Sequence, residues 1–453
     1  MKNSNVDFYE HGLSGKMIAP LSLDLITGPT ISRVVSLLFR RLCMNLPDVE
    51  SALSMAISHD GKIIHLVYLR QRSLIGKARY RPGGRCGRSV LGDPEPDVEL
   101  RKGDDEYTDV YEKLDGSGVN VVGGRTAGPG VGGFTLGGGY SWKTNQFGLT
   151  SDTVKLYNIV LTNGTITTAS ADTNPDLFWA LQGGLNKFGV VTSAEFNTHT
   201  QPDQIYGGII IYSTDYNDQI IAATQKFSEV NTDPKAQLIT TLNTTPLGSL
   251  TFVIYFYDGP DPGNVFSMFD GIESTINLVS TQTFSSFVSL VDSNIQTSPR
   301  GSFNTMPTTK LSAGFLAAVA NQSQALSNVA SNYSGILLSY DVEPFLNYGQ
   351  YARSSAFPHA DSAVPLNLYY SWIGEDNDEF WLSTMQSNVD QLKQVAISEG
   401  IFNETAPLYP NYSPSTATLD QLYSSAGAAR LREIRSAYDP GLVGDLAGGF
   451  SFK

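Results

Sequence analysis

Apolar residues recur every three or four positions in several stretches of the chain, which is the spacing of one helix face. In residues 104–118 the recurring positions are Tyr107, Val110, Tyr111 and Leu114, and a glycine follows as a stop. Residues 174–184, "NPDLFWALQGG", offer Asn174 as a cap and Pro175 as the first helical residue. "DEFWLSTMQSNVDQLKQVAISEG", which ends at Gly400, and "AGAARLREIRSAYDP" predict two further amphipathic helices.

Other stretches alternate in the way that half-buried strands do. Residues 153–161 and 165–170 are rich in β-branched residues and flank Asn163-Gly164, so they predict a hairpin. From residue 203 to 372, strand-like segments such as "GGIIIYST", "LTFVIYFYDG" and "LNLYYSWIG" mix with helices expected near 215–229 and 263–278. This pattern predicts an antiparallel sheet backed by helices.

The composition is that of a globular protein with more than one domain. The 453 residues exceed the usual size of one hydrophobic core, and 41% of them are hydrophobic. Acidic residues outnumber basic ones by 44 to 30, which gives a net charge of −14, and the basic residues form no stripe. Nucleic acid and anionic membranes are therefore not expected as partners.

The cysteines, the apolar runs and the glycosylation triplets say little about the function of the protein. Cys43 and Cys86 lack metal-ligand spacing, so no metal site is predicted, while a single disulfide stays open. Polar residues interrupt the apolar stretch Met17–Cys43, so no transmembrane segment is predicted. No targeting signal is recognisable, and we expect an extracellular or secretory location if the true start of the chain is missing. Glycosylation is left open by six Asn-x-Ser/Thr triplets, at Asn163, Asn243, Asn321, Asn332, Asn403 and Asn411.

Residues 121–142, "VVGGRTAGPGVGGFTLGGGYSW", are unusually rich in glycine. They satisfy the G-x-G-x-x-G pattern, but three more glycines stand where a dinucleotide-binding helix should begin, so no such helix is expected. The interleaved apolar side chains exclude a solvated linker. Two interpretations remain: glycines needed for tight turns, or a packed loop whose backbone N–H groups line an anion cradle.

Three motifs together resemble a known family. "VNVVGGRTAGPGVGGFTLGGGYSWKTNQFGLTSDTV", "NPDLFWALQGGLNKFGVVT" and "LYPNYS" are similar to motifs of the berberine-bridge-enzyme-like FAD-linked oxidoreductases, of fungal type, within the vanillyl-alcohol-oxidase superfamily. The resemblance implies an α+β fold, in which a PCMH-type FAD-binding domain of two α+β subdomains accompanies a substrate domain with an antiparallel sheet backed by helices.

The resemblance also implies domain limits and cofactor contacts. It places the FAD-binding core in residues 96–202, the substrate domain in 203–400 and a returning C-terminal segment in 401–453, after an atypical first segment, 1–95. The residues that would bind FAD are Gly123, Gly124, Arg125, Gly130, Val131, Gly132, Gly133, Gly137, Gly138, Gly139, Gly189, Val190 and Asn411.

The C-terminal motif supplies a catalytic candidate. If the segment is extended, Tyr409 and Asn411 project to one side and Tyr412 to the other. The resemblance places Asn411 against the flavin and makes Tyr412 the base. A phenol with a pKa of about 10 is a poor base unless a cation or hydrogen-bond donors stabilise its phenolate. Without the resemblance, Tyr412 would be taken for a core tyrosine, and His359 and His199 are interpreted as structural.

One part of the pattern departs from the family. Arg85 in "RPGGRCG" stands near the place of the histidine that usually carries the flavin, and Thr126 aligns with the second attachment residue, a cysteine in plant members. Two-point covalent attachment of FAD is therefore not predicted, and single attachment is left in doubt.

The resulting prediction is an enzyme. We expect an FAD-dependent oxidoreductase that removes hydride from a small organic substrate, such as an alcohol, amine, sugar or secondary metabolite, with O₂ as acceptor, acting as a monomer. The competing hypothesis is a flavin-free remnant or binding glycoprotein that retains the scaffold.

Overall fold

The computed structural model describes residues 98–100, 106–290 and 300–452. The contacts of the chain divide it into two units, and all of these residues belong to the second, residues 64–453. The predictions made for residues 1–95, for Cys43 and Cys86 and for Arg85 lie outside the described residues. No helix within the described part has the length and apolar character needed to cross a membrane.

The first sheet is built from the region around the glycine-rich stretch. Its strands are β1 (Val98–Leu100), β3 (Val154–Leu161), β4 (Ile166–Ser170) and β5 (Gly189–Phe196). They pair antiparallel in the order β1-β5-β3-β4. The predicted hairpin at Asn163-Gly164 is confirmed: Gly164 has φ +85°, which glycine adopts at no cost, and Asn163 Oδ1 accepts the Thr165 N–H at 2.9 Å.

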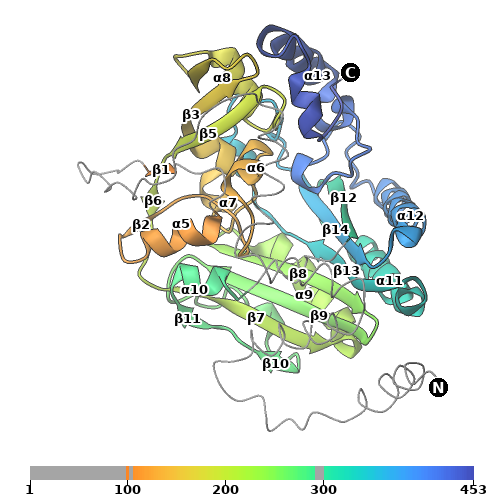
Figure 1. Ribbon diagram of the computed structural model, residues 1–453. Coiled ribbons are helices and arrows are strands. Elements are labelled where there is room, and N and C mark those ends of the chain that lie inside the picture. Colours follow the sequence, from red (N-terminus) through yellow and green to blue (C-terminus); the bar gives the residue numbers. More distant parts are fainter. Residues whose placement is uncertain (1–97, 101–105, 291–299, 453) are drawn as a thin grey trace, which may run out of the picture. The chain divides into compact units, whose positions relative to one another are not determined.

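The second sheet has eight strands and lies below the first in Figure 1. Neighbouring strands follow the order β10-β7-β9-β8-β13-β14-β12, and β11 also pairs with β7, all antiparallel. Their bounds are β7 (Ile205–Ser213), β8 (Ala236–Thr245), β9 (Gly248–Tyr257), β10 (Ile276–Asn277), β11 (Ser280–Gln282), β12 (Arg300–Thr308), β13 (Gly335–Val342) and β14 (Val364–Trp372). A two-stranded sheet joins β2 (Val119–Asn120) to β6 (His199–Thr200).

Helices accompany both sheets, and those of the second sheet lie along it in Figure 1. The α-helices are α5 (Tyr107–Leu114), α6 (Val131–Leu136), α7 (Thr144–Phe147), α8 (Pro175–Leu181), α9 (Asn217–Val230), α10 (Phe284–Val288), α11 (Ala313–Ala330), α12 (Asp378–Ser398) and α13 (Leu419–Tyr438). The 3₁₀ turns are η2 (Thr150–Thr153), η3 (Thr214–Tyr216), η4 (Ser267–Phe269), η6 (Ser331–Tyr333), η7 (Tyr348–Tyr351), η8 (Glu375–Asn377), η9 (Pro410–Tyr412) and η10 (Val443–Ala447).

The two faces of the second sheet differ in polarity near its centre. Leu338, Tyr340 and Val342 of β13 belong to the hydrophobic core that includes residues of α11 and α12. Since side chains of a strand alternate between faces, Ser339 and Asp341 project to the opposite face. Cross-strand partners of these two on the same side are Asn243 and Thr241 of β8 and Tyr369 and Asn367 of β14. This polar row is the part of the sheet that bears on function.

Two local predictions were wrong. The helix expected near 263–278 is replaced by turns, η4 and β10, because Phe266 stacks on Tyr255 and fixes the segment against the sheet. By contrast, Asn174 is the N-cap residue of α8 and Pro175 its first residue, as predicted, although the Asn174 side chain donates to the Thr168 carbonyl at 2.7 Å and makes no capping hydrogen bond.

The second correction concerns the glycine-rich stretch. A short helix, α6, does begin there at Val131, with Gly130 as its N-cap. The dinucleotide fold that such a helix serves is still excluded, because the strand before it, β2, pairs antiparallel with β6 and all pairings among the described strands are antiparallel.

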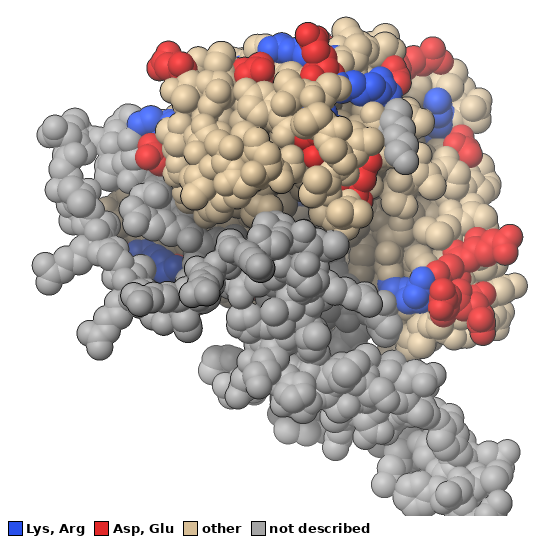
Figure 2. All heavy atoms as spheres, turned by 45° about the horizontal axis from the view of Figure 1, so that its top comes forward, with Lys and Arg blue, Asp and Glu red and all other residues tan. Residues whose placement is uncertain are grey.

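The face of the molecule that Figure 2 shows carries both positive and negative side chains. On that face Lys and Arg side chains lie among Asp and Glu side chains, and several acidic ones gather at one edge.

We expect the core between the second sheet and its helices to depend on Trp381. Its ring is fully buried and its Nε1 donates to the Tyr333 carbonyl at 2.8 Å. Trp381→Ala should lower the free energy of unfolding by roughly 3–5 kcal/mol, since a large cavity and an unpaired carbonyl remain. Thermal unfolding measures this. The matched control is Leu382→Ala, one residue along and 47% exposed, which should change stability by less than about 0.5 kcal/mol. Equal losses would contradict the assignment.

Candidate functional site

Three residues that are far apart in the sequence meet at one point. Arg125 follows β2, Glu343 follows β13 and Tyr412 ends η9. Arg125 Nη2 lies 2.8 Å from Glu343 Oε1, and the same nitrogen donates to the Tyr412 hydroxyl. The Tyr412 hydroxyl in turn donates to Glu343 Oε1 at 3.0 Å. We call Arg125, Glu343 and Tyr412 the polar triad.

Aromatic packing holds Arg125 in place. Its guanidinium carbon lies 5.9 Å from the centre of the Trp142 ring and 5.7 Å from that of Phe345, within the range of cation–π attraction. Trp142 Nε1 also donates to the Arg125 carbonyl at 2.9 Å. The apolar residues interleaved with the glycines thus position the charged group.

Burial sets the protonation of the triad. Burial lowers the pKa of Arg125, but Glu343 and Tyr412 outweigh it and hold the pKa above its ordinary value. Burial raises the pKa of Glu343 although Arg125 opposes it. Burial also raises the pKa of Tyr412 well above its ordinary value, and Arg125 offsets only part of this effect. Tyr412 is therefore a neutral phenol at neutral pH.

Two atoms of the triad keep unused hydrogen-bonding capacity. Arg125 Nη1 and Glu343 Oε2 are both buried and have no hydrogen-bond partner among the described residues. A buried polar atom without a partner is costly, so each of these atoms calls for a complementary group from outside the described chain. The triad is therefore a candidate binding and reaction site.

The C-terminal motif forms a turn and not the extended segment that was expected. Pro410–Tyr412 is the 3₁₀ turn η9, and the Tyr412 N–H bonds to the Tyr409 carbonyl at 3.0 Å. The Tyr409 hydroxyl accepts the N–H groups of Gly139 and Tyr140, at 2.9 and 3.1 Å, and the Asn411 amide at 3.0 Å. Burial raises the pKa of Tyr409 to about 12 despite these donors.

Gly137, Gly138 and Gly139 make room for this turn. A Cβ on Gly137 would lie 1.9 Å from Asn411 Oδ1, and one on Gly139 would lie 2.5 Å from Thr150 Oγ1. Gly138 has φ +112°, a conformation open to glycine. Their N–H groups bond within the chain, to the carbonyls of Gly133 and Thr135 and to the Tyr409 hydroxyl. All three N–H groups therefore already have acceptors within the chain.

The first turn of α6 is different, because it is open. A Cβ on Gly130, Gly132 or Gly133 would meet no described atom within 4 Å. The N–H groups of Val131, Gly132 and Gly133 belong to the first helical turn and have no intrahelical acceptor. This turn fits the predicted cradle better than the later glycines do.

The remaining predicted residues lie in packed backbone. A Cβ on Gly123 would lie 2.2 Å from the Tyr107 ring, one on Gly124 would lie 3.3 Å from it, and the Tyr111 hydroxyl donates to the Gly124 carbonyl at 2.9 Å. At the start of β5, Gly189 approaches the Val160 carbonyl of β3, and Val190 is 40% exposed. No hydrogen bond joins Gly189 or Val190 to the polar triad within the described residues, so their cofactor role stays a prediction.

Sequence reasoning missed Glu343. The signal was present in "GILLSYDVE", where polar residues at positions 339, 341 and 343 alternate with apolar ones. An alternation of this kind marks a strand with one buried apolar face, and two carboxylates on the other face of it mark chemistry. The alternation was not recognised as a strand, so its acids were not considered.

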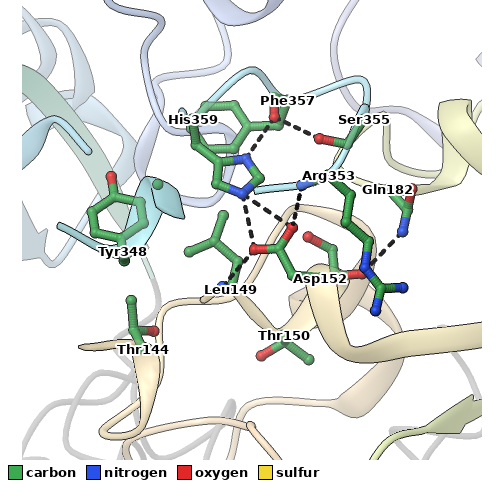
Figure 3. Close-up of polar contacts among 12 residues, drawn as sticks. Thr144, Leu149, Thr150, Asp152, Gln182, Tyr348, Arg353, Ser355, Phe357 and His359 are labelled. Carbon is green, nitrogen blue, oxygen red and sulfur yellow. Dashed lines mark hydrogen bonds and ion pairs between the residues drawn. The ribbon is translucent and has the colours of Figure 1, made fainter. Parts of the chain in front are cut away.

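His359, interpreted from the sequence as structural, lies in a network of polar contacts that Figure 3 shows. Its Nε2 lies 2.9 Å from Asp152 Oδ2 and its Nδ1 lies 2.8 Å from the Phe357 carbonyl. Asp152 also accepts the N–H groups of Leu149 and Arg353, at 2.8 and 3.4 Å. The pair therefore joins the turn η2 to the loop that follows η7.

We expect His359 to stabilise the protein more in acid than in alkali. Burial lowers its pKa, but Asp152 outweighs burial, so the pKa is raised above the ordinary value of about 6.5. The stabilisation is fully present below about pH 6.5 and is lost as the pH rises through the raised pKa. In thermal unfolding, the advantage of the wild type over His359→Gln should shrink between about pH 6 and about pH 9.

His199→Gln provides a control of opposite sign. Burial and then Lys143 lower the pKa of His199 to about 4, so native His199 is neutral. Its contribution to stability should fall as the pH drops below about 6.5, where the unfolded chain takes up a proton. A His359 advantage that is constant or grows with pH would contradict a charged pair with Asp152.

Known proteins with similar sequences are named as FAD-linked oxidoreductases and FAD-dependent monooxygenases. No protein-family model matches the chain. An uncharacterized FAD-linked oxidoreductase of Arthroderma benhamiae is 40% identical over 185 residues, an alignment that spans 40% of this chain and only 37% of that protein. The FAD-dependent monooxygenase drtC of Aspergillus calidoustus is 26% identical over 95% of this chain and 80% of its own length.

Solved structures share the fold at lower identity. The berberine-bridge-enzyme-like protein 1 of Physcomitrella patens superposes with a TM-score of 0.63 at 18% identity, covering 79% of this chain and 78% of its own. The glucooligosaccharide oxidase of Acremonium strictum gives 0.61 at 22% identity, with 78% and 77% covered. These matches confirm the resemblance and the α+β fold class. The chain is a homologue of the fungal FAD-linked oxidoreductases and has the fold of the berberine-bridge-enzyme-like, PCMH-type FAD oxidases.

Proposed function

We propose that the chain is an FAD-dependent oxidoreductase that removes hydride from a small organic substrate at the polar triad, with O₂ as the acceptor and the chain acting as a monomer. The activities named for its relatives, together with its fold, support the cofactor and the reaction class. The observation that carries the proposal is the buried contact among Arg125, Glu343 and Tyr412, with one donor and one acceptor left over.

The described residues fit FAD at two places. The first turn of α6 presents N–H groups that have no acceptor within the helix, and no described atom lies within 4 Å of a Cβ on Gly130, Gly132 or Gly133, so a diphosphate fits there. Arg125 Nη1 is a buried donor without a partner, suited to the edge of a flavin ring that gains negative charge on reduction. Asn411 lies against Gly137 at the end of the same helix. When bound, FAD supplies the hydride acceptor.

The triad supplies a path for the proton that leaves the substrate. The pKa of Tyr412 is too high for a resting phenolate, because burial outweighs Arg125. The phenol, however, already donates its proton to Glu343 Oε1. Tyr412 can therefore accept a proton from a substrate hydroxyl or ammonium as it passes its own to Glu343, and Arg125 stabilises the carboxylate before the transfer. In this proposal Glu343 is the final base and Tyr412 the residue that contacts substrate.

The cofactor can be tested by spectroscopy. Protein purified with added FAD should show the visible absorption of a bound flavin. Acid precipitation should release the colour into the supernatant, because two-point attachment is not predicted and single attachment is in doubt. A colourless protein that takes up no FAD would contradict the enzyme and favour a flavin-free binding protein or remnant. Colour that stays in the pellet would contradict non-covalent binding alone.

The proton path can be tested by substitution. Tyr412→Phe and Glu343→Gln should each slow flavin reduction by substrate by roughly 10²–10⁴-fold, the usual contribution of a positioned acid or base. FAD binding should change little, since neither group is needed for the open turn of α6. Stopped-flow reduction without oxygen and flavin titration separate the two effects.

Tyr333→Phe is the matched control, because Tyr333 is 38% exposed and stacks on Phe380, and it should leave both measurements unchanged. Equal loss of reduction and of FAD binding in Tyr412→Phe would remove Tyr412 from the proton path. An unaffected rate in Glu343→Gln would remove Glu343 as the final base.

A further inference from the structure

A second carboxylate, Asp341, lies two residues before Glu343 on the polar row of the sheet. Its Oδ1 accepts the Ser339 hydroxyl at 2.6 Å and its Oδ2 accepts the Asn367 amide at 2.9 Å. Both oxygens are acceptors, as they are in an ionised carboxylate. Burial raises the pKa of Asp341, and these hydrogen bonds, with Arg125, oppose the rise. The mechanism proposed above does not use this carboxylate.

The charges of the site do not balance. Asp341 raises the pKa of Glu343, and both carboxylates raise the pKa of Tyr412. Arg125 is the one cation among the groups that most strongly affect the pKa values of these three residues. With both carboxylates ionised, the site carries one more negative than positive charge. A charge of this kind in a poorly hydrated place is costly, so either a proton or a positive ligand is favoured there.

On the polar row and next to it, the buried hydrogen-bonding atoms without a partner among the described residues are both acceptors. Glu343 Oε2 and Asn367 Oδ1 are buried acceptors that have no donor among the described residues. Glu343 is 2% exposed and Asn367 is 4% exposed. A ligand that satisfies both must bring N–H or O–H groups.

Aromatic rings stand on the same face. Tyr369 follows Asn367 by two residues on β14, and its cross-strand partner on β12 is Phe303. The centre of the Phe303 ring lies 4.7 Å from that of Tyr369 and 6.3 Å from that of Tyr412. Faces of aromatic rings attract cations and pack well against apolar carbon.

We propose that this face binds an organic amine in its protonated form, with the ammonium group at Asp341, Asn367 and Glu343 and its carbon skeleton against Phe303 and Tyr369. The inference rests on the proposed function and names the substrate class for it. A neutral polyol would satisfy the two acceptors, but it would leave the negative charge uncompensated. The ammonium group satisfies both, which is why the amine is favoured.

The test compares two probes that differ only in charge. 2-Phenylethylamine and 2-phenylethanol share a skeleton, and calorimetric titration of the full chain with added FAD gives the affinity of each. The amine should bind at least about tenfold more tightly, as expected for hydrogen bonds to charged groups. Equal affinities, tighter binding of the alcohol or no measurable binding of the amine would overturn the inference.

A substitution at Asp341 tests whether this carboxylate is the group that binds the ammonium. Asp341→Asn keeps the shape and removes the charge, so it should weaken binding of 2-phenylethylamine by about tenfold or more and leave that of 2-phenylethanol unchanged. The control is Glu375→Gln, at an exposed carboxylate in η8, which should change neither affinity. Equal weakening of both probes in a folded Asp341→Asn protein would overturn the assignment of Asp341.

The outcome is separable from that of the proposed function. Binding is read by heat and not by turnover, so a preference for the amine in a protein that takes up no FAD would uphold the inference and contradict the oxidoreductase. A coloured protein that binds both probes equally would do the reverse. If Asp341→Asn does not fold, the wild-type comparison of the two probes still decides the substrate class.

Discussion

The ion pair between Arg125 and Glu343 is the interaction on which the candidate site depends. It joins the segment after β2 to the end of β13, residues that are 218 positions apart. A buried ion pair gains little net stability, because removing both charges from water costs about as much as their attraction returns. In this protein the ion pair matters for the positions of the residues that it joins and not for stability. The pair fixes the polar row of the second sheet against the glycine-rich segment, and Tyr412 is placed by hydrogen bonds to both partners.

Close backbone approach makes this arrangement possible. The C-terminal turn η9 packs closely on this stretch: a side chain at Gly137 would collide with Asn411, and the Gly139 N–H donates to the hydroxyl of Tyr409, which precedes the turn. The glycine-rich stretch therefore combines two roles that the sequence could not separate. Its first glycines leave the amides of α6 open, and its last three admit the turn that carries Tyr412. Tight packing, one of the two competing interpretations, holds for the later glycines, while the proposed anion cradle would lie in the neighbouring first turn of α6.

The sequence allowed the motifs to be predicted but not the way in which they meet. The hairpin at Asn163-Gly164 and the helices with clear apolar spacing follow from local rules, because turn chemistry and helix periodicity act over a few residues. Local rules did not predict the structure of the segment near 263–278, because the stacking of Phe266 on Tyr255 is a contact made by tertiary packing. Glu343 was missed for the same reason. A lone acid in a strand gains meaning only when a distant arginine and tyrosine come to face it, and no local pattern records that.

The physical state of Tyr412 decides how the site can work. A phenolate would be favoured by Arg125, but the same cation is already paired with Glu343, so its field at the phenol is largely cancelled. Deprotonating Tyr412 would place a second negative charge beside a buried carboxylate, and burial makes that state costly. A concerted transfer avoids it, because the phenol never holds a full charge while its proton moves to Glu343. Within the proposed function, the arrangement therefore favours a tyrosine that relays a proton over one that stores a negative charge. The same proposal makes Glu343, which no motif had pointed to, the group whose pKa would govern the pH dependence of the reaction.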